Sequence, residues 1–245
     1  MNDFIIPNWP APANVRALVT TRQGGVSRGA YASFNLADHV GDDPQAVAAN
    51  RKLLRERVPG LPADPLWLKQ VHGTTFIEVE ISDPGVEADA SWAYTPGSVC
   101  AVLTADCLPL LLCDQEGSVV SAVHAGWQGL AKGVIEAAVN TLDVPAKNLL
   151  AWMGPAIGAQ AFEVGADVRD QFFLHDAKAA EAFTSIANGK WLGDLYLLAC
   201  QHLNALGVTQ IYGGGECTVT DAERFYSFRR DKTTGRMASL IWLTS

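Results

Sequence analysis

Residues 99–127 read VCAVLTADCLPLLLCDQEGSVVSAVHAGW, and this stretch decides the fold. It holds three short apolar runs, at 99–103, 110–113 and 119–123, separated by segments that contain Asp, Pro and Gly. Short runs that are apolar at nearly every position are typical of strands buried on both faces. The stretch therefore predicts the central strands of a sheet that lies inside the protein.

The flanking sequence alternates between strand and helix patterns. Further strands are predicted at 15–20, 66–70, 75–81, 149–153, 211–212 and 239–243, and helices at 43–57, 128–142, 164–173, 177–186 and 194–206. Strands interspersed with helices predict an α/β (α+β) fold, a layered domain with a mixed β-sheet core flanked by helices. Because no repeat and no Pro/Gly/Ser-rich linker divides the chain, we expect residues 1–245 to form a single domain.

The composition is that of an acidic globular protein. The 245 residues include 18 Lys and Arg against 26 Asp and Glu, which gives a formal net charge of −8, and 49% of them are hydrophobic. This balance excludes a disordered chain. The negative charge argues against a nucleic-acid or anionic-membrane partner, because both need a basic surface.

The N-terminal segment and the cysteines indicate the compartment. The first residues, MNDFIIP, lack the basic and apolar regions of a signal peptide. The longest unbroken apolar runs, such as 195–200, have about six residues, far below the roughly 20 that a membrane-spanning helix needs. The five cysteines are an odd number in a chain large enough to fold without disulfides. We therefore expect a cytoplasmic protein with reduced thiols.

Three segments place a metal ligand where a predicted strand gives way to a loop. His72 follows the strand 66–70, Cys107 lies between the runs 99–103 and 110–113, and His124 follows the run 119–123. Two imidazoles and a thiolate suit Zn²⁺, and three protein ligands leave the fourth position open, as in catalytic sites. The spacing also allows the alternative that each residue is a buried Cys or a hydrogen-bonded core His.

Charged residues near predicted turns are candidates for substrate contacts and proton transfer. Arg22, beside Gly24-Gly25, and the pair Arg229-Arg230 are candidate anion contacts, with solvated surface arginines as the alternative. Asp89 and Asp106 are candidate proton-transfer groups, with turn or cap acids as the alternative.

Taken together, these motifs resemble a known family, the YfiH-type proteins, which are also called laccase-domain or polyphenol-oxidase-like proteins and are described as purine nucleoside phosphorylases. The matching segments run through almost the whole chain in order: Thr20-Thr21-Arg22, Phe34-Asn35-Leu36, His39-Val40-Gly41-Asp42, Gln70-Val71-His72-Gly73, Ala88-Asp89-Ala90, Thr104-Ala105-Asp106-Cys107, His124-Ala125-Gly126-Trp127, Gly154-Pro155-Ala156, Phe162-Glu163-Val164 and Phe225-Tyr226-Ser227-Phe228-Arg229-Arg230-Asp231.

The resemblance implies one zinc per chain, held by His72, Cys107 and His124. It further implies phosphorolysis of adenosine, inosine, guanosine and methylthioadenosine to the base and ribose 1-phosphate, deamination of adenosine, and in some members a role in peptidoglycan editing. On this basis the predicted catalytic residues are Cys107, His124, His72, Asp89 and Asp106, and the predicted substrate- and phosphate-binding residues are Arg22, Asn35, Gln70, Arg229 and Arg230.

Each reaction places a physical demand on these residues. A three-ligand zinc lowers the pKa of a bound water toward neutrality, which suits attack on the purine ring in deamination. Phosphorolysis needs a phosphate held beside C1′ of the ribose, and a guanidinium fork matches phosphate oxygens. The family usually reads His-Ala-Gly-Trp-Arg-Gly, whereas this chain has Gln128 at the arginine position, so another arginine would have to supply that charge.

Three other functions compete with this interpretation. The several copper sites of a multicopper oxidase need more histidines than the five in this chain, so we do not expect copper despite the laccase label. A cysteine hydrolase or amidase would use Cys107 as nucleophile and His124 or His72 as base. A non-catalytic binding module would hold no metal and convert no nucleoside.

Overall fold

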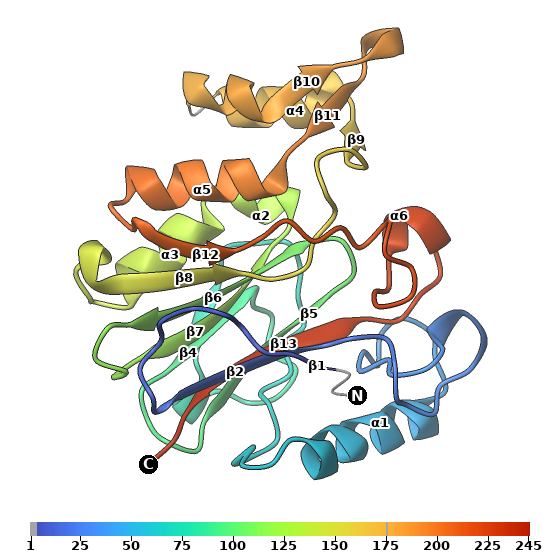
Figure 1. Ribbon diagram of the computed structural model, residues 1–245, viewed down its shortest axis with the longest axis vertical. Helices are drawn as coiled ribbons and strands as arrows, with labels where there is room; N and C mark the ends of the chain where they lie inside the picture. The colour runs from blue at the N-terminus through green and yellow to red at the C-terminus, as the bar shows by residue number, and fades with distance from the viewer. Residues whose placement is uncertain (1–3, 175) are drawn as a thin grey trace.

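Two sheets packed face to face form the centre of the fold in the computed structural model, which describes residues 4–174 and 176–245 (Figure 1). The larger sheet has the strand order β12-β8-β6-β7-β4-β3 and the smaller has the order β1-β2-β13-β5. The larger sheet comprises β12 (Gln210–Gly213), β8 (Leu149–Met153), β6 (Leu108–Asp114), β7 (Val120–Ala125), β4 (Ala90–Ala93) and β3 (Phe76–Glu78). The smaller comprises β1 (Phe4–Ile5), β2 (Val15–Thr20), β13 (Met237–Leu243) and β5 (Val99–Thr104).

The larger sheet is mixed, as predicted. Its outer pairs, β12 with β8 and β3 with β4, are parallel, whereas β6 pairs antiparallel with both β7 and β8. The side chains of β6 explain its unbroken apolar run. Leu110 and Leu112 pack into the core on the helical side of the sheet, and Leu111 and Cys113 pack into the core between the two sheets. Because successive side chains of a strand point to opposite faces, a strand buried on both faces is apolar throughout.

Helices cover the outer faces of both sheets, so the layers run helix, sheet, sheet, helix (Figure 1). Helices α2 (Trp127–Lys132), α3 (Val134–Thr141) and α5 (Leu195–Ala205) lie on the larger sheet and share its outer core. Helix α1 (Pro44–Arg57) covers the smaller sheet, where Leu54 packs against Leu18 and Leu240. Its N-cap is Asp43, whose side chain accepts a hydrogen bond from the Gln45 N–H.

A small third sheet lies at the top of Figure 1, beyond α5. Its strands β9 (Glu163–Val164), β10 (Phe183–Ser185) and β11 (Trp191–Gly193) pair in the order β10-β11-β9, and α4 (Ala166–Phe173) packs beside them. The short helix α6 (Phe228–Asp231) precedes the last strand. Within the described residues, no helix is long and apolar enough to cross a membrane.

Several predicted elements were wrong in detail. The strand expected at 75–81 is limited to Phe76–Glu78 and continues as a 3-10 helix, Val79–Ile81, and the helix expected at 164–173 begins at Ala166, after strand β9. The helix expected at 128–142 is divided into two helices, α2 and α3. The break lies at Gly133, whose φ of 90° is not helical. The segment 177–186 forms a 3-10 helix, Ala177–Ala182, followed by strand β10, since pairing with β11 overrides its alanine-rich helical composition. The strand expected at 66–70 makes only isolated bridges, at Leu66 and Lys69.

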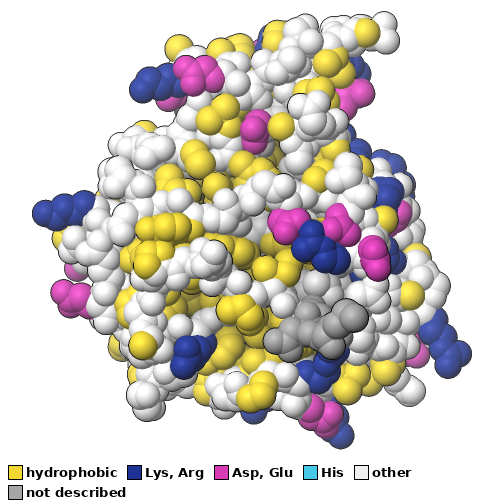
Figure 2. All heavy atoms as spheres, in the orientation of Figure 1, with side chains coloured by type: hydrophobic (Ala, Val, Ile, Leu, Met, Phe, Trp, Pro, Cys, Tyr) yellow, Lys and Arg dark blue, Asp and Glu magenta, His cyan; other side chains and the backbone are white. Residues whose placement is uncertain are grey.

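On the face shown in Figure 2, hydrophobic side chains gather over the region of β8 and β12, and charged side chains lie mainly around the periphery. Lys and Arg side chains on this face are interspersed with Asp and Glu.

Candidate functional site

The three predicted metal ligands meet at one end of the larger sheet. Cys107 lies in the tight connection between β5 and β6, and His124 lies near the end of β7, the strand that pairs with β6. His72 comes from the loop before β3 and has a φ of 58°. Their ligand atoms all lie within 4.8 Å of one another. This arrangement can hold one metal ion.

The spacing of the donor atoms fits a tetrahedral ion. The Cys107 Sγ lies 3.7 Å from the His72 Nε2. Zn–N and Zn–S bonds of about 2.0–2.1 and 2.3 Å that meet at a tetrahedral angle separate the two ligand atoms by about 3.6 Å. Gly126 keeps the space between these ligands open, because a Cβ there would lie 2.9 Å from both the Cys107 Sγ and the His72 Cδ2.

Asp89 is buried behind the ligands and orients two of them. Its Oδ1 lies 2.8 Å from the His124 Nδ1 and accepts a hydrogen bond from the His72 N–H at 2.9 Å. Its Oδ2 accepts hydrogen bonds from the N–H groups of Gly73 at 2.6 Å and Val71 at 3.3 Å. With a proton on Nδ1, His124 presents Nε2 to the metal, as in carboxylate–histidine–metal arrangements. These contacts suit Asp89 to hold His72 and His124 in place, and its role in proton transfer stays a prediction.

The electrostatics of the cluster stabilise a thiolate at Cys107 and a protonated imidazole at His124 when no metal is bound. Burial raises the pKa of the Cys107 thiol, but the charge of His124 and hydrogen bonds from His124 and His72 outweigh burial and bring the pKa well below its usual value. Burial also raises the pKa of Asp89, but its hydrogen bonds with His124 and Gly73 lower the pKa by more. The thiolate is the form of cysteine that binds metals.

A pocket of about 360 Å³ opens beside the cluster. This volume lies at the small end of the range for small-molecule sites. Its lining has an apolar part, made by Ile157, Phe162, Val164, Val168 and Leu195, and a polar part that includes His72, Cys107, Asp106, Arg229 and Lys232. Trp127 and Phe228 complete the wall. An apolar cavity with a few convergent polar groups is typical of a ligand site.

Two further predicted residues line this pocket: Asp106, a predicted proton-transfer group, and Arg229, a predicted phosphate contact. Asp106 uses one carboxylate oxygen to accept the Thr218 hydroxyl at 2.6 Å and the other to accept the Arg229 N–H at 2.6 Å. The Arg229 Nη1 donates to the Glu163 carbonyl at 2.7 Å. Asp106 therefore ties α6 to the connection that carries Cys107.

The other two arginines predicted to contact phosphate, Arg22 and Arg230, donate hydrogen bonds to the chain outside this pocket. Arg22 donates to the carbonyls of Ala32 and Ala222 and lies over the Tyr226 ring. Arg230 donates to the carbonyls of Thr218, Val219 and Phe225 and pairs with Asp231. Both guanidinium groups therefore hold loops together.

The two predicted polar contacts Asn35 and Gln70 also bond to the chain. Asn35 is fully buried and donates to the Ala37 carbonyl and the Asp42 carboxylate. Gln70 makes a pair of 2.8 Å hydrogen bonds with the backbone N–H and C=O of Leu103. Their amides fix the loops around the cluster.

Sequence reasoning missed Trp127, Phe228 and Lys232, which line the pocket. Trp127 could have been found from its place three residues after His124. Phe228 and Lys232 could have been found from their position in one aromatic and basic segment, 225–236.

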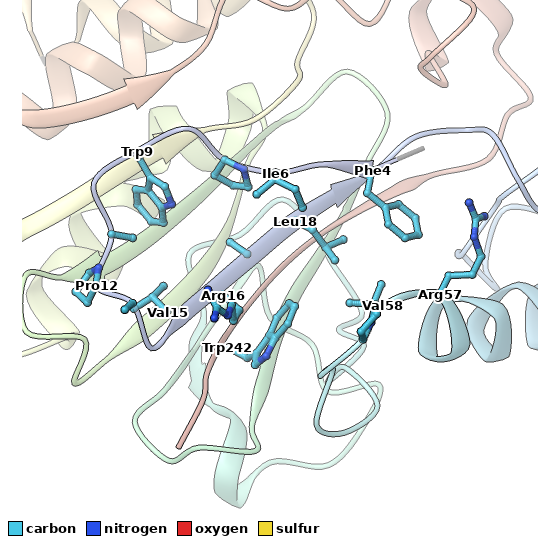
Figure 3. Close-up of a pocket in the computed structure, with 15 residues that line it drawn as sticks. Phe4, Ile6, Trp9, Pro12, Val15, Arg16, Leu18, Arg57, Val58 and Trp242 are labelled. Atoms are coloured by element: carbon cyan, nitrogen blue, oxygen red, sulfur yellow. The ribbon is translucent and has the colours of Figure 1, made fainter. Parts of the chain in front are cut away.

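A second cavity, of about 380 Å³, lies along β2 and β13 under the N-terminal segment (Figure 3). Its lining includes Phe4, Trp9, Leu18, Val58 and Trp242, and it contains no predicted site residue.

The comparisons with known proteins agree with this geometry. The sequence family described as multi-copper polyphenol oxidoreductase laccase matches residues 16–244. A purine nucleoside phosphorylase of Pseudomonas aeruginosa is 54% identical over 99% of both chains, and the purine nucleoside phosphorylase YfiH of Escherichia coli is 51% identical over 99% of this chain and 100% of that protein. The chain belongs to the YfiH family.

Solved structures of the family have the same fold. A Neisseria meningitidis protein matches with a TM-score of 0.96 at 50% identity over the full length of both chains. A Bacillus licheniformis protein titled YfiH matches with a TM-score of 0.88 at 30% identity, over 94% of this chain and 93% of that one.

The copper description of the family and the enzyme names of its members differ. Within residues 4–174 and 176–245, His72, Cys107 and His124 form the one group of three or more His, Cys, Asp or Glu side chains that could hold a metal ion. A multicopper oxidase requires several such groups. The arrangement of this member therefore fits the enzyme names better than the copper description.

Proposed function

We propose that this protein is a zinc-dependent purine nucleoside phosphorylase. It converts adenosine, inosine, guanosine and methylthioadenosine, with phosphate, to the base and ribose 1-phosphate, and it deaminates adenosine at the same site. The observation that carries this proposal is the His72-Cys107-His124 group at the wall of a pocket with one apolar and one polar part. Relatives named as purine nucleoside phosphorylases, 51–54% identical over nearly the full chain, support it.

Zinc is the metal we assign to the group. Two histidine nitrogens and one thiolate are its usual donors, and three protein ligands are typical of catalytic zinc. When bound, zinc supplies Lewis acidity, which polarises a group of the substrate.

The side chains around the pocket have separate tasks in phosphorolysis. Phe162 and its apolar neighbours bind the purine, and the basic side chains at the polar part of the pocket attract phosphate. A phosphate oxygen then forms a bond to C1′ of the ribose while the bond from C1′ to the base breaks. The electron pair goes to the base nitrogen, which takes up a proton. Asp89 holds His124 and the His72 backbone in place throughout.

We also propose that residues 1–245 act as one domain in the cytoplasm. All five cysteines are free, as expected for a chain kept in a reducing compartment.

One observation favours a second candidate, a cysteine hydrolase or amidase. The Cys107 thiol has a lowered pKa and contacts His72, as an activated nucleophile would. Such an enzyme would form a bond from Sγ to an acyl carbon while the bond from that carbon to the amine breaks, with the histidine giving its proton to the leaving amine; water would then hydrolyse the thioester, and no metal would be needed.

Incubation of purified protein with inosine, with and without inorganic phosphate, separates these functions. We expect hypoxanthine and ribose 1-phosphate to appear together and only when phosphate is present. Free ribose without phosphate would indicate a hydrolase. Inactivity toward every purine nucleoside, by protein that contains zinc, would reject the proposed function and favour the cysteine hydrolase.

A further inference from the structure

Arg236 lies across from the connection that carries Cys107, although 129 positions separate the two residues in the sequence. Strand β13 begins at Met237, which pairs with Thr104, the last residue of β5. Arg236 therefore stands across from Ala105, in the connection that carries Asp106 and Cys107. Two hydrogen bonds fix its backbone: its N–H donates to the Asn35 Oδ1, and its C=O accepts from the Leu36 N–H.

The guanidinium of Arg236 is half-buried and has donors to spare. Its Nη1 donates to the carbonyls of Thr234 and Gly235, at 2.9 and 3.0 Å. In the described part of the chain, Nε and Nη2 have no hydrogen-bond partner and no carboxylate forms an ion pair with this group. Arg230, by contrast, uses all three of its guanidinium nitrogens on carbonyls and on the Asp231 carboxylate. A half-buried cation without a counter-ion is suited to bind an anion.

A second cation lies on the same aromatic ring. The Lys232 Nζ and the Arg236 Cζ are each 5.9 Å from the centre of the Phe228 ring. Phe228 and Lys232 both line the pocket that contains Cys107. The side chain of Lys232 is exposed, so it can reach an anion from the solvent side while Arg236 approaches from the protein side.

We infer that Lys232, which lines the pocket, and Arg236, whose guanidinium lies against the pocket-lining Phe228 ring, form a phosphate subsite at the edge of the pocket, an inference that rests on the proposed phosphorolysis. Arg236 offers two adjacent N–H directions, which match two oxygens of one phosphate. Lys232 adds a point charge on the solvent side. Asn35 takes a positioning role, because its Oδ1 fixes the backbone of Arg236.

The subsite also sets the direction in which the nucleoside enters. Phosphate at Arg236 lies at the polar part of the pocket, near Cys107, so the base must lie in the apolar part formed by Phe162, Val168 and Leu195. The ribose then lies between the two, with C1′ accessible to the phosphate.

The test is phosphate binding by the zinc-loaded protein and its Arg236→Gln and Lys232→Gln variants. We expect Arg236→Gln to raise the KM for phosphate, and the Kd for inorganic phosphate measured by calorimetry, about 10- to 100-fold, because a charge-assisted bond is lost. Lys232→Gln should raise both several-fold. Zinc content and inosine affinity without phosphate should not change. The exposed Arg28 lies outside the pocket, so Arg28→Gln is a control with the same change of charge.

The outcomes separate this subsite from the proposed function. Phosphate-dependent cleavage of inosine with an unchanged KM for phosphate in both variants would overturn the subsite and leave the function in place. A purely structural role of Arg236 would lower the melting temperature and leave the KM for phosphate unmoved, which also overturns the subsite. If Arg236→Gln does not fold, Lys232→Gln carries the same test. If wild type cleaves no nucleoside, calorimetry with phosphate alone still decides for or against the two residues.

Discussion

Replacement of Asp89 by Asn tests how the second layer of residues holds the metal cluster. The carboxylate of Asp89 accepts hydrogen bonds with both oxygens, from the His124 ring and from the backbone N–H groups of His72, Gly73 and Val71. Asn has the same shape but only one acceptor oxygen, and its NH₂ group only donates. Whichever way the amide turns, its NH₂ group replaces one of the two carboxylate oxygens of Asp89. That NH₂ group then faces an N–H that an oxygen accepted in the wild type.

The size of the effect follows from these contacts. If the NH₂ faces His124, the imidazole must move its proton to Nε2, the nitrogen that would bind the metal. If it faces Gly73 instead, the loop that carries His72 loses a 2.6 Å hydrogen bond. Loss of such an outer partner typically weakens metal binding about 10- to 100-fold. A buried N–H left without a partner costs about 1–3 kcal/mol of stability.

Competition with a chromogenic zinc chelator measures the metal affinity, and thermal unfolding of the metal-free protein measures the stability. Asp114→Asn is a matched control, because Asp114 is also buried and accepts the N–H groups of Ser118 and Val119 far from the cluster. Asp114→Asn should keep its zinc affinity, because its contacts lie far from the cluster and the amide oxygen can still accept both N–H groups. Equal zinc affinities of Asp89→Asn and wild type would refute the positioning role of Asp89.

Three further substitutions test the site. Gly126→Ala puts a Cβ 2.9 Å from the Cys107 Sγ and the His72 Cδ2, and the φ of −66° at this position is one that alanine tolerates. The substitution should therefore displace these ligands and weaken zinc binding at least about tenfold while the fold persists. An unchanged chelator titration would argue against the ligand assignment. Cys107→Ala should lose most of the zinc seen by elemental analysis, and full zinc content in the mutant would remove Cys107 from the site. Gln128→Arg restores the family's charge at the second residue of α2, next to Trp127. A gained charge-assisted hydrogen bond of about 1.5–3 kcal/mol should lower the KM for phosphate about 10- to 100-fold. Identical kinetics with altered thermal stability would show a structural role instead.

The fold was predictable where burial leaves a pattern in the sequence. The run 110–113 is apolar because both faces of β6 are covered, and the Asp43-Pro44 start of α1 is visible because an N-cap is a local signal. The segment 177–186 was mispredicted because its state depends on pairing with Trp191–Gly193, which local composition does not encode. A single glycine with a positive φ, Gly133, broke the predicted helix at 128–142.

The candidate site was predictable in its ligands and less so in its surroundings. His72, Cys107 and His124 each lie near the end of a predicted strand, and the fold brings them together as expected. The use of Arg22, Gln70 and Arg230 was not predictable, because a sequence does not show which polar side chains backbone groups occupy. The position of Arg236 was not predictable for the same reason, since the pairing of β13 with β5 places it across from Ala105.

The dependence of phosphorolysis on added zinc tests the central claim, that the His72-Cys107-His124 group is the metal centre of a phosphorylase. Protein stripped of metal with a chelator would be titrated with zinc while hypoxanthine release from inosine is followed in phosphate buffer. We predict no release at first, a linear rise in rate, and a plateau at about one zinc per chain. A full rate in the stripped protein, or a rate that does not respond to zinc, would contradict the claim.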